Sequence, residues 1–94
     1  MKLQQMRYLV EISKTGSISK AAQNLFMTQP SLSTAISKLE EELQIEIFER
    51  GSKGIQFTPE GAELLGYARQ LLDQVETIKK RFSGKKNEET VRFS

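Results

Sequence analysis

Residues 16–43 read GSISKAAQNLFMTQPSLSTAISKLEEEL, and this stretch decides the fold. A short helical pattern occupies about 20–25 and contains two adjacent alanines, which let another helix approach closely. Phe26 and Met27 interrupt the pattern, and a longer helix is predicted over about 28–43. A gap of about three residues between two helices is typical of a helix-turn-helix.

Another helix is predicted before this unit, over about 3–15. Its apolar residues recur at helical spacing: Leu3, Met6, Leu9 and Val10. Gly16 is a suitable left-handed stop for this helix. Ser17 and Ser19 are candidate N-caps for the short helix, and Thr28 is the candidate N-cap for the longer one.

A different pattern follows the third helix. The runs over 47–50 and 55–58 are short and partly β-branched or aromatic, and the turn between them has glycine at both ends. This pattern predicts a small two-stranded β-hairpin. Beside a helix-turn-helix such a hairpin is a wing. The predicted fold is therefore mainly α: residues 1–58 form a winged helix-turn-helix of three helices and a two-stranded wing.

A long helix is predicted from Pro59 to about Phe82. Thr58 is a candidate N-cap, proline stands at the first helical position, and Glu60 places an acid in the first turn. Apolar residues continue along one seam at alternating spacings of four and three: Leu64, Ala68, Leu71, Val75, Ile78 and Phe82. At ~1.5 Å per residue the helix is roughly 36 Å long.

This seam packs either on its own domain or on the same helix of a second chain. The length of the helix favours a second chain, at least for the distal half. We therefore interpret 59–83 as a linker helix that dimerises the protein, and 84–94 as a polar linker and the start of a missing domain. The bases over 79–81 and 85–86 either touch phosphate or solvate the helix end.

The third helix has a polar face suited to reading DNA. Its predicted buried face comprises Leu32, Ala35, Ile36, Leu39 and Leu43. The opposite side carries Ser33, Thr34, Ser37 and Lys38, with Gln29 and Ser31 at its margins. Such side chains can lie close against base edges, and glutamine can pair bidentately with adenine. The alternative is a merely solvated helix face.

Acidic residues fix the orientation of this helix. Glu40, Glu41 and Glu42 all lie at its C-terminal end. Because phosphates repel them, that end is predicted to point away from DNA. The N-terminal half, with the positive end of the helix dipole, is predicted to enter the major groove.

Three bases outside the third helix are candidate DNA contacts. Lys20, at the start of the short helix, can reach a phosphate. Arg50 and Lys53 lie in the predicted wing, whose tip commonly lies over the minor groove. The alternative for all three is ordinary surface charge, and for Arg50 an ion pair with Glu46 or Glu49.

The composition excludes several functions. The chain has 94 residues, room for one small domain plus an extended element. It contains no Cys and no His, which excludes disulfides, thiolate or imidazole metal sites, and nucleophiles activated by histidine. No paired carboxylates or Gly-rich phosphate loop are recognisable. We expect no enzymatic activity, no metal and no cofactor.

Charge and hydropathy narrow the setting. The net charge is +2, and the basic excess begins near Arg50, so a DNA surface must be built from local patches. No apolar stretch of signal-peptide or membrane-spanning length occurs. We expect a cytoplasmic protein with no membrane partner.

Several stretches together resemble the LysR-type transcriptional regulators. They are LQQMRYLV over 3–10, GSISKAA over 16–22, TQPSLS over 28–33 with Ile36, Leu39-Glu40 and Leu43 after it, IFER over 47–50 and FTPEG over 57–61. The similarity covers about 2–82 in unbroken order. It implies a bacterial transcription regulator whose long helix dimerises the protein.

The resemblance also implies roles for individual residues. Gln29, Pro30, Ser33, Thr34 and the wing base Lys53 stand at DNA-contact positions. Neighbours of these, Thr28 and Ser31, stand at positions that touch the DNA backbone. Members of the family continue into a larger domain that binds a small effector. Of that domain only 91–94 is present here, and it resembles the first strand. We therefore expect the chain to be a fragment of a longer regulator.

Two positions depart from the family pattern. Thr34 stands where arginine is frequent, which changes a common DNA contact. Gln44-Ile45-Glu46 replaces a frequent glycine, hydrophobic residue and arginine. Without the glycine, the exit from the third helix requires a non-glycine residue in a strained or different conformation.

The sequence predicts a homodimer that binds an interrupted inverted repeat in double-stranded DNA. A module that binds another protein is the alternative from a different class. The salt dependence of affinity separates the two, because phosphate contacts weaken steeply as salt rises.

Overall fold

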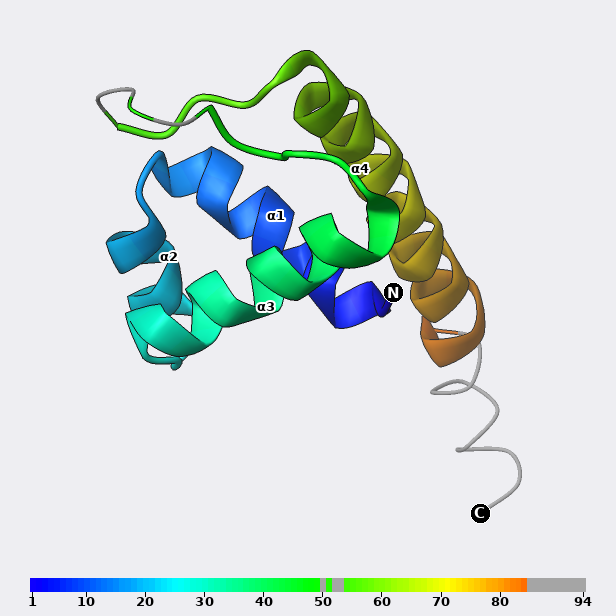
Figure 1. The fold of residues 1–94 in the computed structure, drawn as a ribbon. Helices are drawn as coiled ribbons and strands as arrows, with labels where there is room; N and C mark the ends of the chain where they lie inside the picture. Colours follow the sequence, from blue (N-terminus) through cyan, green and yellow to red (C-terminus); the bar gives the residue numbers. More distant parts are fainter. Residues whose placement is uncertain (50, 52–53, 85–94) are drawn as a thin grey trace.

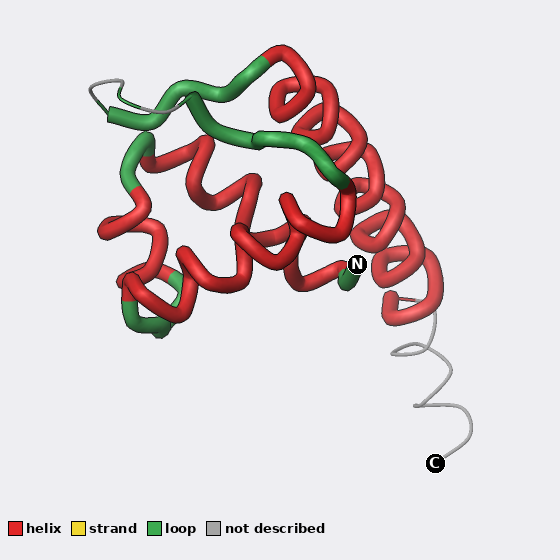
Figure 2. Tube along the Cα trace, in the orientation of Figure 1, coloured by secondary structure: helices red, strands yellow, loops and turns green. Residues whose placement is uncertain are grey.

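A computed structural model describes residues 1–49, 51 and 54–84 of the chain. The described residues form the helices α1 (Leu3–Thr15), α2 (Ile18–Asn24), α3 (Gln29–Leu43) and α4 (Pro59–Lys79), and a π-helical segment (Lys80–Gly84) continues α4. In Figure 1, α1, α2 and α3 form a bundle, and α4 lies along one side of it and projects beyond it. Figure 2 shows that the connections between helices are short, except for the hairpin that joins α3 to α4.

The core lies where the three N-terminal helices meet the first half of α4. The buried apolar residues are Met6, Leu9, Ile12, Ala21, Ala22, Leu32, Ile36, Leu39, Ile47, Leu65 and Ala68. The two alanines of α2 are buried, as a close helix contact requires. On α3 the predicted inner face is confirmed at Leu32, Ile36 and Leu39, whereas Ala35 and Leu43 are only partly buried.

Three of the four predicted N-cap residues cap a helix through their hydroxyls. The Ser17 hydroxyl accepts from the Lys20 N–H at 3.2 Å, and the Thr28 hydroxyl accepts from the Ser31 N–H at 3.2 Å. The Thr58 hydroxyl accepts from the N–H of the third residue of α4 at 2.9 Å. Gly16 ends α1 in the left-handed conformation, also as predicted.

Two helix boundaries differ from the predictions. The second helix begins at Ile18 rather than Lys20, because Ser17 rather than Ser19 is its N-cap, and it ends at Asn24. The last helix is α-helical only to Lys79 and continues as a π-helical segment instead of running as a regular α-helix to Phe82.

The wing prediction needs correction within the described residues. The two arms meet in one antiparallel bridge, between Phe48 and Phe57, rather than in two regular strands. The Glu49 N–H donates to the carbonyl of Gln56 at 2.8 Å, and the two phenyl rings pack with centroids 4.9 Å apart. On the side of Ile47 the ladder ends because the Ile47 N–H donates to a carboxylate oxygen of α3, at 2.7 Å, instead of extending the ladder.

Candidate nucleic-acid interface

The predicted DNA-contact residues of α3 form one accessible surface. Gln29, Pro30, Ser31, Thr34, Ser37 and Lys38 are exposed, as is the N-cap Thr28, and Ser33 is partly buried. The opposite side of α3 carries the buried Leu32, Ile36 and Leu39. The amphipathic separation of the helix therefore follows the predicted pattern, and its polar side is available to a partner.

The first turn of this surface is held by its own hydroxyls. Besides accepting from the Ser31 N–H, the Thr28 hydroxyl donates to the Ser31 hydroxyl at 2.8 Å. Proline follows Gln29 and fixes the backbone at the start of the helix. The N-terminal end of α3 is thus pre-organised, and Gln29 projects from a fixed turn.

From the end of α1 through most of α3, every charged side chain is positive. The continuous stretch 12–39 contains Lys14, Lys20 and Lys38 and no acidic residue. All three lysines are exposed. No carboxylate within residues 12–39 would therefore repel an approaching polyanion.

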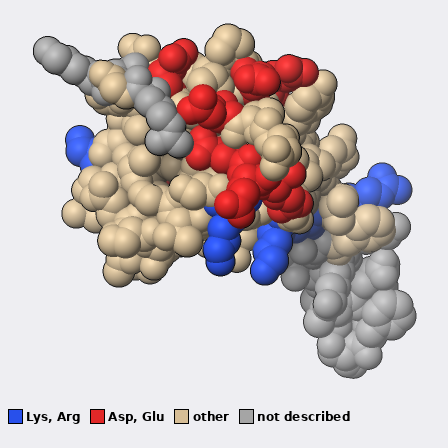
Figure 3. All heavy atoms as spheres, viewed as in Figure 1, with Lys and Arg blue, Asp and Glu red and all other residues tan. Residues whose placement is uncertain are grey.

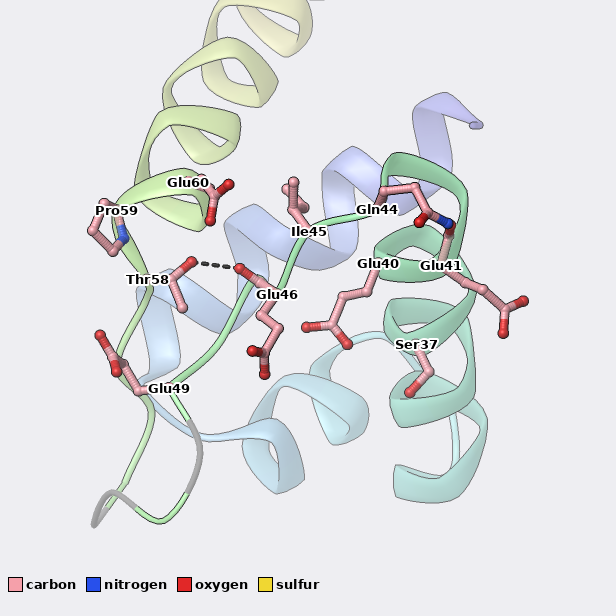
Figure 4. Close-up of a pocket in the computed structure, with 10 residues that line it drawn as sticks. All are labelled: Ser37, Glu40, Glu41, Gln44, Ile45, Glu46, Glu49, Thr58, Pro59 and Glu60. Carbon is pink, nitrogen blue, oxygen red and sulfur yellow. Dashed lines mark hydrogen bonds between the residues drawn. The ribbon is translucent and has the colours of Figure 1, made fainter.

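Carboxylates gather beyond this stretch (Figure 3). A surface pocket near the C-terminal end of α3 is lined by five of them: Glu40, Glu41, Glu46, Glu49 and Glu60. They come from α3, the first arm of the hairpin and the start of α4 (Figure 4). Nothing among the described residues forms a group of three or more ligands able to hold a metal ion. This acidic surface repels phosphate, so a duplex is repelled less at the N-terminal half of α3 than at its C-terminal end.

The hairpin adjoins the polar side of α3. Ser33 and Ser37 share a surface pocket with Phe48, Gly51 and Ile55 of the hairpin. In Figure 1 the arms of the hairpin extend toward the side of the molecule where α2 lies. Arg50 and Lys53, the two predicted wing contacts, lie outside the described residues.

A single backbone position joins α3, the hairpin and α4. The Ile47 N–H donates to Glu40, and the Ile47 carbonyl accepts from the Thr58 N–H at 3.0 Å. Gly61, in the first turn of α4, lies so close that a Cβ there would be 2.1 Å from the Ile47 carbonyl oxygen. The Thr58 hydroxyl donates to the carbonyl of Glu46, as the dashed line in Figure 4 marks. The hairpin and α4 are thus both fixed to α3.

The predicted dimer seam needs correction at one residue. Ala68 is fully buried in the core of its own domain, together with Leu65. Leu64 and Val75 are partly buried. The large hydrophobic residues that α4 and the segment after it expose are Tyr67 at 56%, Leu71 at 45%, Ile78 at 54% and Phe82 at 59%. The exposed stripe therefore includes Tyr67, which the heptad pattern did not indicate, and excludes Ala68.

Residues 3–62 match the family described as "Bacterial regulatory helix-turn-helix protein, lysR family". The chain belongs to this LysR family. The chain is 42% identical over 96 positions to the HTH-type transcriptional regulator BenM of Acinetobacter baylyi, an alignment that covers 99% of this chain and 31% of BenM. It is 41% identical over 81 positions to the HTH-type transcriptional regulator CysB of Haemophilus influenzae, covering 84% of this chain and 25% of CysB.

Solved structures agree with this LysR membership. The fold matches the crystal structure "BenM_DBD/catB site 1 DNA Complex" with a TM-score of 0.81 at 42% identity, covering 89% of this chain and 95% of that one. It matches full-length BenM, in its R156H mutant, with a TM-score of 0.82 at 41% identity, covering 88% of this chain and 27% of that one. The chain spans less than a third of the length of BenM and CysB.

None of the helices in the described part of the chain combines the length and the apolar character that crossing a membrane requires. Both BenM and CysB are transcriptional regulators by name.

Proposed function

We propose that this chain is the DNA-binding part of a LysR-type transcriptional regulator and binds double-stranded DNA as a homodimer. The N-terminal half of α3 enters the major groove, and the hairpin over 47–58 lies at the minor groove. The DNA site is an interrupted inverted repeat. In the cytoplasm, the rest of the regulator would add a domain that binds a small effector.

The observation that carries this proposal is the exposed polar side of α3 in a fold shared with a relative solved in a DNA complex. Gln29, Ser33, Thr34 and Pro30 are the proposed contacts to base edges, with Ser37 and Lys38 further along the same side. Thr28, Ser31 and Lys20 are proposed to contact the sugar-phosphate backbone, and Arg50 and Lys53 to act from the wing. The acidic surface near the C-terminal end of α3 supports the orientation.

The proposed homodimer rests on the exposed apolar stripe of the long helix. Tyr67, Leu71, Ile78 and Phe82 are each at least 45% exposed. Large apolar side chains grouped on one helix face are typical of a surface that a partner covers. Pairing two α4 helices would set two α3 helices at a fixed separation, which an inverted repeat matches.

Salt dependence tests DNA binding against the protein-binding alternative. For a duplex ligand, the logarithm of affinity falls linearly with the logarithm of salt, with a slope of about −0.9 for each phosphate neutralised. We expect a steep slope for the wild-type chain. Lys20→Gln is expected to make the slope shallower by about 1 for each chain bound. Lys14→Gln is the matched control, since Lys14 is also exposed but lies on α1.

Fluorescence anisotropy of a labelled duplex between low and moderate salt measures this slope. Equal slopes for the two variants would remove Lys20 from the interface. If the chain bound no duplex at any salt, the protein-binding function would take the place of the one proposed here.

A further inference from the structure

One side chain in the helix-turn-helix has no role in the fold. Phe26, in the turn between α2 and α3, is 97% exposed, more than any other large hydrophobic residue of the described chain. Its φ of 58° lies in the left-handed region, which a phenylalanine rarely adopts. Both features are unfavourable for the isolated domain. The apolar ring is surrounded by water, and the left-handed backbone favours glycine or asparagine over phenylalanine.

The turn does not need the phenyl ring. The Phe26 N–H donates to the Gln23 carbonyl at 3.1 Å, and the Met27 N–H donates to the Ala22 carbonyl at 2.9 Å. Both bonds are backbone bonds that any residue at these positions could make. Leu25 and Met27, on either side, pack partly against the core, whereas Phe26 does not. Phe26 therefore combines an exposed ring and an unfavourable φ with no benefit to the fold, and such residues are expected at functional positions.

The position of the turn indicates what the ring contacts. The turn leads directly into Thr28 and Gln29, so it lies at the end of α3 proposed to enter the major groove (Figure 1). It belongs to the stretch 12–39 that has no acidic residue. The major groove offers one apolar group for a ring to meet, the 5-methyl of thymine, and phenylalanine is suited to that contact.

We propose that Phe26 is a specificity-determining residue whose ring packs on a thymine methyl group, next to the base edge that Gln29 contacts. This inference rests on the proposed DNA binding and adds a preference for thymine at one position of each half-site. The cost of exposing the ring and of its backbone conformation is then offset when DNA covers the ring.

The test uses the duplex that the wild-type chain enriches from a random DNA pool. Each thymidine of that duplex is replaced in turn by deoxyuridine, which lacks only the 5-methyl group. We expect one replacement per half-site to weaken wild-type binding about fourfold, the factor equivalent to ~0.8 kcal/mol for one buried carbon group. Phe26→Asn is expected to bind the unmodified duplex more weakly and to be indifferent to that replacement.

Phe26→Leu and a random duplex complete the design. Phe26→Leu keeps an apolar side chain and is expected to remain sensitive to the replacement, which keeps the test decisive if Phe26→Asn folds poorly by circular dichroism. Loss of affinity by Phe26→Asn that is equal on selected and random duplexes would place the ring on the sugar-phosphate backbone and overturn the inference. So would a wild-type chain insensitive to every replacement. Failure to enrich any duplex would instead overturn the proposed function itself.

Discussion

Replacing Gly61 by alanine tests how the long helix is fixed to the hairpin. An alanine Cβ at this position would be 2.1 Å from the Ile47 carbonyl oxygen, 2.8 Å from its carbon and 2.9 Å from the Ile47 Cα. All three are backbone atoms, which cannot move aside as a flexible side chain would. A carbon and a carbonyl oxygen approach no closer than about 3.3 Å, so α4 and the hairpin must separate by roughly 1 Å.

The magnitude follows from opposing terms. Glycine to alanine inside a helix ordinarily stabilises by about 0.5–1 kcal/mol. Overpacking costs about 1–3 kcal/mol, and the separation would also weaken the hydrogen bond from the Thr58 N–H to the Ile47 carbonyl. We expect Gly61→Ala to lower the free energy of unfolding by about 1–3 kcal/mol in total, because the clash with fixed backbone exceeds the helix gain.

Gly66 supplies the matched control on the same helix. A Cβ at Gly66 meets nothing within 4 Å, so Gly66→Ala is expected to stabilise by about 0.5–1 kcal/mol. Urea unfolding followed by circular dichroism, at one protein concentration, measures both variants. The two changes should have opposite signs. A Gly61→Ala variant as stable as Gly66→Ala would refute the close approach of α4 to Ile47.

Three further variants test the interface, the dimer and the exit from α3. Ser33→Ala is expected to weaken binding to the selected duplex by ~1–3 kcal/mol, measured by anisotropy, and an equal loss on random DNA would contradict a base-reading role. Leu71→Lys is expected to convert the proposed dimer to monomer in sedimentation, since it places a charge in the exposed stripe. Thr77→Lys, on another side of α4, should leave the mass unchanged. An unchanged mass for Leu71→Lys would count against the stripe as the dimer surface. Gln44→Gly is expected to raise the free energy of unfolding by about 0.5–1 kcal/mol in urea unfolding, because Gln44 has a φ of 58° at the C-cap of α3. A lower urea midpoint would show that the hydrogen bond from the Gln44 side chain to the Glu41 carbonyl, at 2.8 Å, contributes more than the backbone strain costs.

Local chemistry made the helices predictable. Thr28 and Thr58 each precede a proline and cap the helix that follows, so both starts follow from a few adjacent residues. The strained exit from α3 was expected from the resemblance to the family, in which a glycine is frequent where this chain has Gln44, and the φ of Gln44 is positive. The polar side of α3 followed from helical periodicity alone.

Features that depend on contacts between distant residues were not predictable. Ile47 bonds to Glu40 and to Thr58 at once, and this pairing, rather than the pattern of the arms, ends the ladder on the Ile47 side of the Phe48–Phe57 bridge. A heptad pattern does not show which of its positions pack into the core of the same domain. The predicted seam therefore included the buried Ala68 and omitted the exposed Tyr67. The near-complete exposure of a phenylalanine in the turn had no signal in the sequence.

Selection of bound duplexes from a random DNA pool, at moderate salt, tests the central claim most directly. Two α3 helices paired through α4 and reading base edges predict enrichment of an interrupted inverted repeat. Binding that enriches no sequence would contradict recognition by the polar side of α3, and enrichment of a single uninterrupted half-site would contradict the dimer.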